Sequence, residues 1–123
     1  MPDITITPAD SPDVMCNFVV PRADGEIRFS VPRADYSFNF EKKWTDWIEK
    51  RMEPVLQEDG STVVPEAPTD REAMIEQLRI AGGLSASVVK KIEKLTNGEL
   101  AQIYTAWDAA SKVTMGESAA SAN

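Results

Sequence analysis

The chain has 123 residues, of which 42% are hydrophobic, and its 20 acidic and 13 basic residues give a formal net charge of −7. This length is sufficient for one compact domain and too short for two domains with separate cores. The negative charge repels phosphate groups, so binding to nucleic acids or to anionic membranes is disfavoured, and a partner with basic or apolar surface is favoured.

Two residue types narrow the class of protein further. Cys16 is the single cysteine, so an internal disulfide is excluded and a reducing cytoplasm is expected. The chain has no histidine, which removes the commonest general base, the commonest transition-metal ligand and any Ser–His or Cys–His pair. The sequence shows neither a signal peptide nor an apolar run of the roughly 18 residues that a membrane helix needs. We therefore expect a cytosolic protein that is not an enzyme and has no cofactor or metal.

The first elements in the chain predict a β-hairpin. Residues 1–14 are rich in proline and aspartate and predict an irregular arm. Residues 16–20 are β-prone, and residues 26–31 alternate apolar and polar side chains as a half-buried strand does. Asp24-Gly25 lies between these two runs and is a dipeptide that tight hairpin turns prefer.

A seven-residue pattern occurs twice, at a distance of eleven residues. Residues 18–24 read Phe-Val-Val-Pro-Arg-Ala-Asp, and residues 29–35 read Phe-Ser-Val-Pro-Arg-Ala-Asp. In the favoured interpretation each copy ends a strand, because proline cannot donate to a ladder and aspartate favours a turn. The alternative is a duplicated binding motif built on Arg22 and Arg33.

The segment after Asn39 has helical periodicity. Asn39 suits the N-cap position, and Pro54 ends the predicted helix. The apolar positions of this helix are Phe40, Trp44, Trp47, Ile48 and Met52. Tryptophan at this spacing is most often part of a core, and the alternative is a tryptophan that anchors a partner. A protein that binds another protein needs exposed apolar surface, and this aromatic helix is the leading candidate.

The second half of the chain predicts three short amphipathic helices. Capping-box patterns at Thr69–Glu72 and Thr96–Glu99 begin the first and the third helix, and Gly82-Gly83 ends the first. The second helix begins near Ser85 or Ser87. The buried positions expected on these helices are Met74, Ile75, Leu78, Val88, Ile92, Leu95, Leu100, Ile103, Tyr104, Trp107 and Ala110.

The predicted fold is α+β and mainly α. Residues 1–56 contain the N-terminal arm, the β-hairpin and the aromatic helix. Residues 57–68 are polar and proline-rich and predict a mobile linker, and residues 69–112 predict a small three-helix bundle. Residues 113–123 are too poor in apolar residues to pack and predict a disordered tail.

The C-terminal part of the sequence carries a family resemblance. Residues 95–104 read Leu-Thr-Asn-Gly-Glu-Leu-Ala-Gln-Ile-Tyr, Trp107 follows, and residues 116–121 read Gly-Glu-Ser-Ala-Ala-Ser. Together with Pro-Arg-Ala-Asp at residues 32–35, which aromatic residues follow, this pattern resembles the short tail assembly chaperone of long-tailed actinobacteriophages. The resemblance covers residues 30–123 and leaves the first thirty residues weakly matched.

The resemblance implies a function, partners and a location. In that family the short protein coats the tape measure protein and keeps it soluble until tail tube subunits polymerise around it. It acts in the host cytoplasm and is not expected in the mature virion. A longer product of programmed frameshifting recruits the tail tube protein, and Gly116-Glu117 is similar to the place where the ribosome slips. Self-association of the chain stays open.

The candidate protein-binding residues combine the aromatic helix with the aromatic face of the last helix. They are Phe40, Trp44, Trp47, Ile48, Met52, Tyr104 and Trp107. Apolar contact on an acidic scaffold would hold a client reversibly, without covalent chemistry.

Other functions are alternatives. A structural virion component, such as a head–tail completion protein, is the second hypothesis, and a DNA-mimicking regulator rests on negative charge alone. An enzyme has the least support, because no convergent cluster of titratable groups is visible. A helix-turn-helix DNA reader is disfavoured, because its second helix would expose Glu99, Gln102 and Asp108 where basic or amide residues are needed.

Deleting residues 116–123 should leave the melting temperature unchanged, because a segment without an apolar stripe adds no buried surface. Differential scanning calorimetry of the full and the shortened chain measures this. A clear fall in melting temperature would mean that the segment packs against the rest of the chain.

Overall fold

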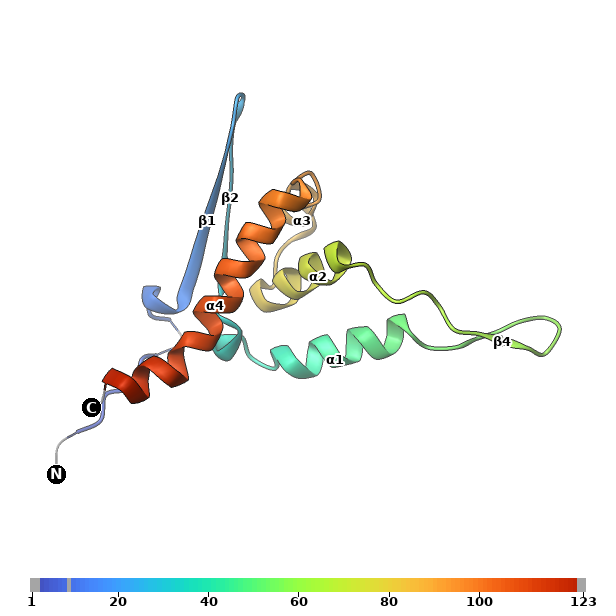
Figure 1. Ribbon diagram of the computed structural model, residues 1–123, viewed down its shortest axis with the longest axis horizontal. Coiled ribbons are helices and arrows are strands. Elements are labelled where there is room, and N and C mark those ends of the chain that lie inside the picture. The colour runs from blue at the N-terminus through green and yellow to red at the C-terminus, as the bar shows by residue number, and fades with distance from the viewer. Residues whose placement is uncertain (1–2, 9, 122–123) are drawn as a thin grey trace.

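The structure is a computed structural model that describes the backbone of residues 3–8 and 10–121 and the side chains of these residues as far as Lys112. The fold is α+β and mainly helical, as the sequence predicts (Figure 1). The elements in chain order are the 3-10 helix η1 (Pro12–Val14), β1 (Met15–Arg22), β2 (Gly25–Pro32), the 3-10 helix η2 (Ala34–Tyr36), α1 (Phe40–Arg51), β3 (Val55–Leu56), β4 (Thr62–Val63), α2 (Asp70–Gly82), α3 (Ala86–Ile92) and α4 (Asn97–Ser121).

Strands β1 and β2 form the predicted hairpin, with a turn one residue earlier than expected. The antiparallel register leaves Ala23 and Asp24 as the two turn residues, both with negative φ, and Gly25 follows at φ +139°. This arrangement is typical of a type I turn, in which glycine is favoured at the last position. The same register places Phe18 opposite Phe29, with ring centroids 5.4 Å apart. Such an aromatic cross-strand pair stabilises the hairpin.

One hydrophobic core unites the hairpin with the helices that follow the 57–68 segment. The hairpin stands against α4, and α2 and α3 close the other side (Figure 1). The core residues are Val20, Phe29 and Val31 from the hairpin, and Ile75, Leu78, Ala81, Ile92, Leu95, Leu100, Ile103 and Trp107 from the helical half. Met74, Val88 and Tyr104, which were also predicted to be buried, lie at the edge of this core and are half-buried.

The predicted helix starts are confirmed. At the start of α2, the Glu72 N–H donates to Thr69 Oγ1 at 3.1 Å and the Thr69 N–H donates to Glu72 Oε1 at 3.4 Å. The equivalent bonds between Thr96 and Glu99 begin α4, at 3.1 and 2.9 Å. Gly83 ends α2 in the left-handed region at φ +56°, where glycine has no steric penalty.

Helix α1 begins and ends where the sequence predicts, but its N-cap works differently. Asn39 occupies the N-cap position with φ +58°, and its side chain makes no capping hydrogen bond. Asparagine tolerates this left-handed conformation better than most residues, so its role here lies in the backbone turn. The last helical residue is Arg51, three residues before Pro54.

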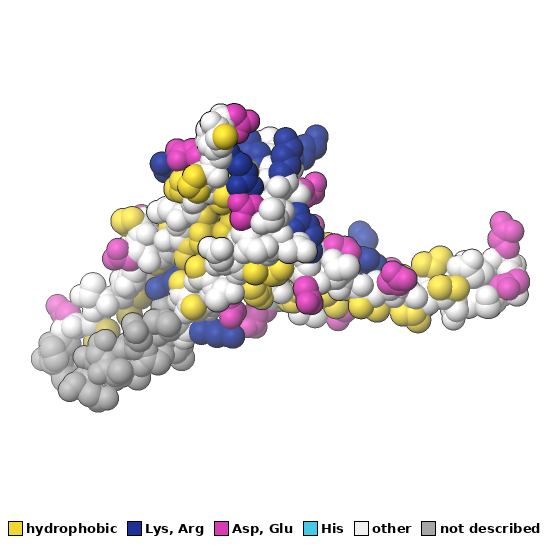
Figure 2. All heavy atoms as spheres, turned by 45° about the horizontal axis from the view of Figure 1, so that its top comes forward, with side chains coloured by type: hydrophobic (Ala, Val, Ile, Leu, Met, Phe, Trp, Pro, Cys, Tyr) yellow, Lys and Arg dark blue, Asp and Glu magenta, His cyan; other side chains and the backbone are white. Residues whose placement is uncertain are grey.

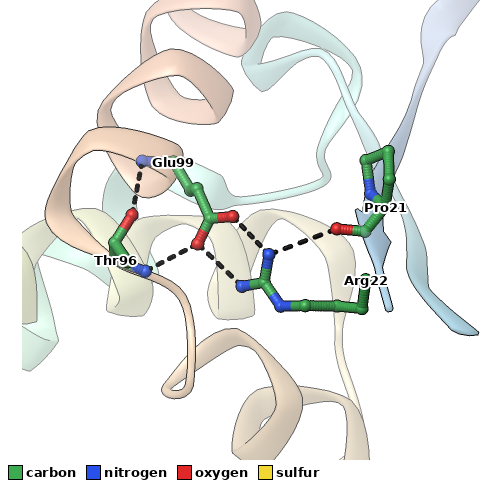
Figure 3. Close-up of polar contacts among 4 residues, drawn as sticks. All are labelled: Pro21, Arg22, Thr96 and Glu99. Carbon is green, nitrogen blue, oxygen red and sulfur yellow. Dashed lines mark hydrogen bonds and ion pairs between the residues drawn. The ribbon is translucent and has the colours of Figure 1, made fainter. Parts of the chain in front are cut away.

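The two copies of the repeated pattern each end a strand, as the favoured interpretation predicts. Arg22 is the last residue of β1 and donates to Glu99 at the start of α4, with Nη2 2.7 Å from Oε1 and Nη1 bonded to Oε2 (Figure 3). In the second copy, the Arg33 guanidinium lies 4.8 Å from the centre of the Tyr36 ring and 3.5 Å from Asp35. Both arginines therefore have partners within the fold, and these contacts do not favour the duplicated binding motif.

The last helix extends beyond the predicted bundle. Its backbone is helical as far as Ser121, whereas the sequence predicted an unstructured tail from residue 113. Once a helix is nucleated, each further residue adds a hydrogen bond at little cost, and alanine is the best helix former. The side chains of residues 113–121, including those of Gly116 and Glu117, and the whole of residues 122–123 lie outside the described part of the chain, so the packing prediction for the tail stands as stated. None of the helices in the described range could cross a membrane.

The Arg22–Glu99 pair gives the fold a specific dependence on pH. Hydrogen bonds from the Arg22 guanidinium and from the Thr96 backbone lower the pKa of Glu99 from 4.5 to about 2. A depressed pKa contributes stability that is present above the unfolded value and is lost as the pH falls through the folded value. The free energy of unfolding of the wild type should therefore exceed that of Glu99→Gln at pH 7, and the difference should shrink as the pH falls from about 5 to about 2.

Urea denaturation at a series of pH values measures this difference. Glu26→Gln is the matched control, because Glu26 pairs with Arg28 on the same exposed strand and joins no two elements. A difference between wild type and Glu99→Gln that stays constant over this range of pH would contradict the assignment.

Candidate protein-binding surface

The structure divides the predicted aromatic residues between core and surface. Trp107 is 2% exposed, and its ring N–H donates to the carbonyl of Pro32 at 2.8 Å. Tyr104 is half-buried beside it and donates its hydroxyl to Gln77 Oε1 at 2.7 Å, and burial raises the pKa of this hydroxyl. Trp107 is one of the candidate binding residues, but it is buried in this fold and is therefore not accessible to a partner.

Helix α1 contributes no fully buried side chain. Phe40, in its first turn, packs edge-on against Trp107 with ring centroids 5.5 Å apart and lies at the margin of the core. Trp44 and Trp47 are half-buried and stack on each other, with ring centroids 5.3 Å apart and planes 9° from parallel. The interpretation that tryptophan here is part of the core is therefore correct for Trp107 and wrong for Trp44 and Trp47.

The physical reason lies in the way α1 is held. The hairpin, α2, α3 and α4 converge on one core, whereas α1 makes its main helix contact with α2 alone. One neighbouring helix covers only part of an apolar face as wide as this one. Trp44 and Trp47 are three residues apart, which is the spacing at which side chains on a helix meet, so they satisfy part of their apolar area against each other.

A shallow groove of about 350 Å³ lies beside this tryptophan pair. It is lined by Trp47, Arg71, Glu72, Ile75, Glu76 and Glu93. Arg71 is held in place at its rim, because it donates to the Glu93 carbonyl at 2.7 Å and to Asn97 Oδ1 at 2.9 Å. The lining therefore combines two apolar side chains, Trp47 and Ile75, with four charged ones.

Ile48 and Met52 extend the apolar strip of α1 toward its C-terminal end, and both are half-buried. We call the strip formed by Trp44, Trp47, Ile48 and Met52 the α1 strip. Phe40 is the link between the α1 strip and the core.

A second β-hairpin, made of strands β3 and β4, lies partly within residues 57–68, the segment that was predicted to be a mobile linker. In this β3–β4 arm, Val55 lies opposite Val63 and Leu56 lies opposite Thr62, and the arm projects away from the helices (Figure 1). The sequence held a signal for it, because Asp59-Gly60 is a hairpin dipeptide with apolar residues Val55-Leu56 before it and the β-branched run Thr62-Val63-Val64 after it. The nearby prolines and acidic residues led to the linker interpretation.

The arm exposes apolar side chains to solvent. Val55, Leu56, Val63 and Val64 are between 51% and 72% exposed. Figure 2 shows hydrophobic side chains along the arm and acidic side chains at its tip. Sequence reasoning missed these residues as candidates for binding.

The charge of the arm is of one sign. Residues 53–69 contain no lysine or arginine, and their four acidic residues are Glu53, Glu58, Asp59 and Glu66. The Asp59 carboxylate accepts from the Ser61 N–H at 3.0 Å and from its hydroxyl at 2.6 Å, and these bonds lower the pKa of Asp59. The turn therefore keeps its negative charge at neutral pH.

The thiol of Cys16 is half-buried. Burial raises the pKa of the Cys16 thiol, which keeps it protonated at neutral pH, and Cys16 packs against the core as predicted. Over the described residues, no three cysteine, aspartate or glutamate side chains gather in a way that could hold a metal ion.

Comparison of the chain with models of protein families, with curated proteins and with solved structures gives no match.

The two environments of tryptophan predict two different costs of truncation. Trp107→Ala should lower the free energy of unfolding by about 3–5 kcal/mol, since it leaves a cavity in the core and an unpaired carbonyl at Pro32. Trp44→Ala should cost within about 1 kcal/mol, because its ring lies outside the core. Urea denaturation followed by circular dichroism measures both values, and equal losses would contradict this division.

Proposed function

We propose that this chain is a tail assembly chaperone that binds the tape measure protein of a phage and keeps it soluble until tail tube subunits assemble around it. The observation that carries the proposal is the stacked Trp44–Trp47 pair, which lies outside the core on α1. The resemblance of residues 30–123 to that chaperone family supports it. On this proposal the chain acts in the host cytoplasm and is not retained in the mature virion.

The α1 strip is suited to a helical client. A tape measure protein is long and hydrophobic, and a helix with an apolar stripe would place side chains at i, i+4 and i+7 against Trp44, Trp47 and Ile48. Aromatic anchors at a partly open site give large contact area at low entropic cost, which is why tryptophan is enriched at binding hot spots. The groove lined by Trp47 and Ile75 offers a position for one such side chain.

The charge of the chain is suited to the same task. A client that is covered by several copies of a protein with a net charge of −7 gains a repulsive surface that opposes aggregation. These contacts are apolar and electrostatic, so tail tube subunits can displace the chaperone by mass action without breaking a covalent bond. A longer product of the same gene, carrying an extra segment that binds the tail tube protein, would bring those subunits to the client.

Replacing Trp44 and Trp47 together with alanine should leave the tape measure protein insoluble when the two are co-expressed. The double variant removes both aromatic anchors and leaves the core residues in place, so the chain itself should stay folded. The measurement is the share of tape measure protein in the soluble fraction, together with a pull-down on this chain.

Phe38→Ala is the matched control, because Phe38 is 84% exposed and lies just before α1, outside the strip. It should keep the client soluble. A soluble client with a folded Trp44→Ala/Trp47→Ala variant would exclude the α1 strip as the binding surface. Finding the chain in purified virions in amounts comparable to structural proteins would contradict the chaperone function.

A further inference from the structure

The β3–β4 arm is a second surface that the α1 strip does not explain. Its sheet has two strands, so both are edge strands. An isolated two-stranded hairpin is only marginally stable in water, and stability normally comes from a third strand or from packing on a helix. Within the described part of the chain, neither a third strand nor a helix covers the exposed valines and leucine of this arm.

The two faces of the arm are both apolar. Val55 and Val63 lie directly opposite each other and share one face. Leu56 lies on the other face with Thr62. Val64 follows β4 directly and is 61% exposed. A surface hairpin normally keeps one face polar, so this pattern is not explained by the arm acting as a spacer.

The backbone of the arm distinguishes its two edges. The Gln57 N–H donates to the Ser61 carbonyl at 2.7 Å, so this pair lies inside the ladder and the next pair, Leu56 and Thr62, directs its backbone groups outward. On the β3 edge, the next outward position is Pro54, which has no N–H and blocks an added strand. On the β4 edge, the next outward position is Val64, which has both groups. The β4 edge is therefore the one open to pairing.

The charge of the arm selects the chemistry of what can pair there. Residues 53–69 carry four acidic residues and no basic one, so a segment with lysine or arginine is attracted and another copy of the arm is repelled. We propose that the β4 edge of the arm binds an extended segment of a partner protein in which aliphatic and basic residues alternate. Its backbone extends the sheet as a third strand, its aliphatic side chains cover one face of the arm, and its basic side chains pair with the acidic residues.

This site goes beyond the proposed chaperone function, and it does not depend on the identity of the client at the α1 strip. Recognition by strand addition uses main-chain hydrogen bonds for affinity and alternate side chains for specificity. It therefore takes an extended segment, whereas the α1 strip is suited to a helix.

The test uses three fluorescein-labelled peptides and the full chain, with fluorescence anisotropy as the measurement. The probe is Lys-Val repeated four times, and the controls are Lys-Pro and Glu-Val repeated four times. The Lys-Val peptide should bind at least about tenfold more tightly than either control. In Lys-Pro, proline removes every second N–H and fixes φ at about −65°, which disfavours a regular β-strand, and Glu-Val has the wrong charge. Equal affinity for Lys-Val and Lys-Pro would overturn the proposal, since it would leave only charge attraction.

Substitutions at one outward position separate the edge from the rest of the arm. Thr62→Pro removes an N–H that the hairpin itself does not use and should weaken Lys-Val binding about tenfold. Thr62→Val keeps the N–H and should bind at least as well as the wild type. An unchanged affinity of Thr62→Pro would exclude strand addition at β4.

Two further outcomes separate this site from other occupants. The Trp44→Ala/Trp47→Ala variant should bind the Lys-Val peptide with unchanged affinity, so failure of the chaperone proposal and failure of this one are distinguishable. Sedimentation should show no change in the mass of the chain between wild type and Thr62→Pro. A concentration-dependent dimer that Thr62→Pro abolishes would overturn the proposal in favour of a second copy as the occupant.

Discussion

The burial of Trp107 holds together segments that are far apart in the sequence. Its ring N–H bonds to the carbonyl at the end of β2, and its ring edge meets Phe40 at the start of α1. A side chain without this ring N–H in the same interior position would leave the Pro32 carbonyl unpaired, at a cost of about 1–3 kcal/mol. One side chain of α4 thus fixes both where the hairpin ends and where the aromatic helix starts, and α1 is tied to the core through its first turn only.

The position of α1 explains why the chain keeps two tryptophans outside the core. Beyond Phe40, the helix lies against α2, and the apolar face that continues through Trp44, Trp47 and Met52 is wider than one helix can cover. Apolar area left in water costs about 25 cal/mol per Å², and stacking the two indole rings removes part of that area and leaves the rest. Folding stability alone therefore does not account for this pair, whereas the proposed client would cover it.

The elements that the sequence predicts well are those whose signals are local. The capping boxes at Thr69 and Thr96 and the left-handed stop at Gly83 depend on residues within one turn, and all three are where the sequence places them. Tryptophan burial depends on how many elements converge in space, so the same helical periodicity precedes a buried Trp107 and a half-buried Trp44. The arm was missed for a related reason. Asp59-Gly60 is a local hairpin signal, but the apolar residues beside it are exposed, so the sequence shows no buried face that would mark them as strands.

An arginine at the end of α1 anchors the base of the arm. Arg51 donates to the carbonyl of Glu66 at 2.6 Å and lies 3.5 Å from the carboxylate of Glu72, so it ties the returning strand of the arm to the start of α2. This contact fixes the base of the arm, and the hairpin beyond it projects clear of the helices (Figure 1). The α1 strip and the β4 edge lie on different elements, so the helical segment proposed for one and the extended segment proposed for the other would not require the same residues. The path of the chain accounts for this arrangement. Pro54 follows the end of α1, and the chain forms both strands of the arm before it returns to Arg51.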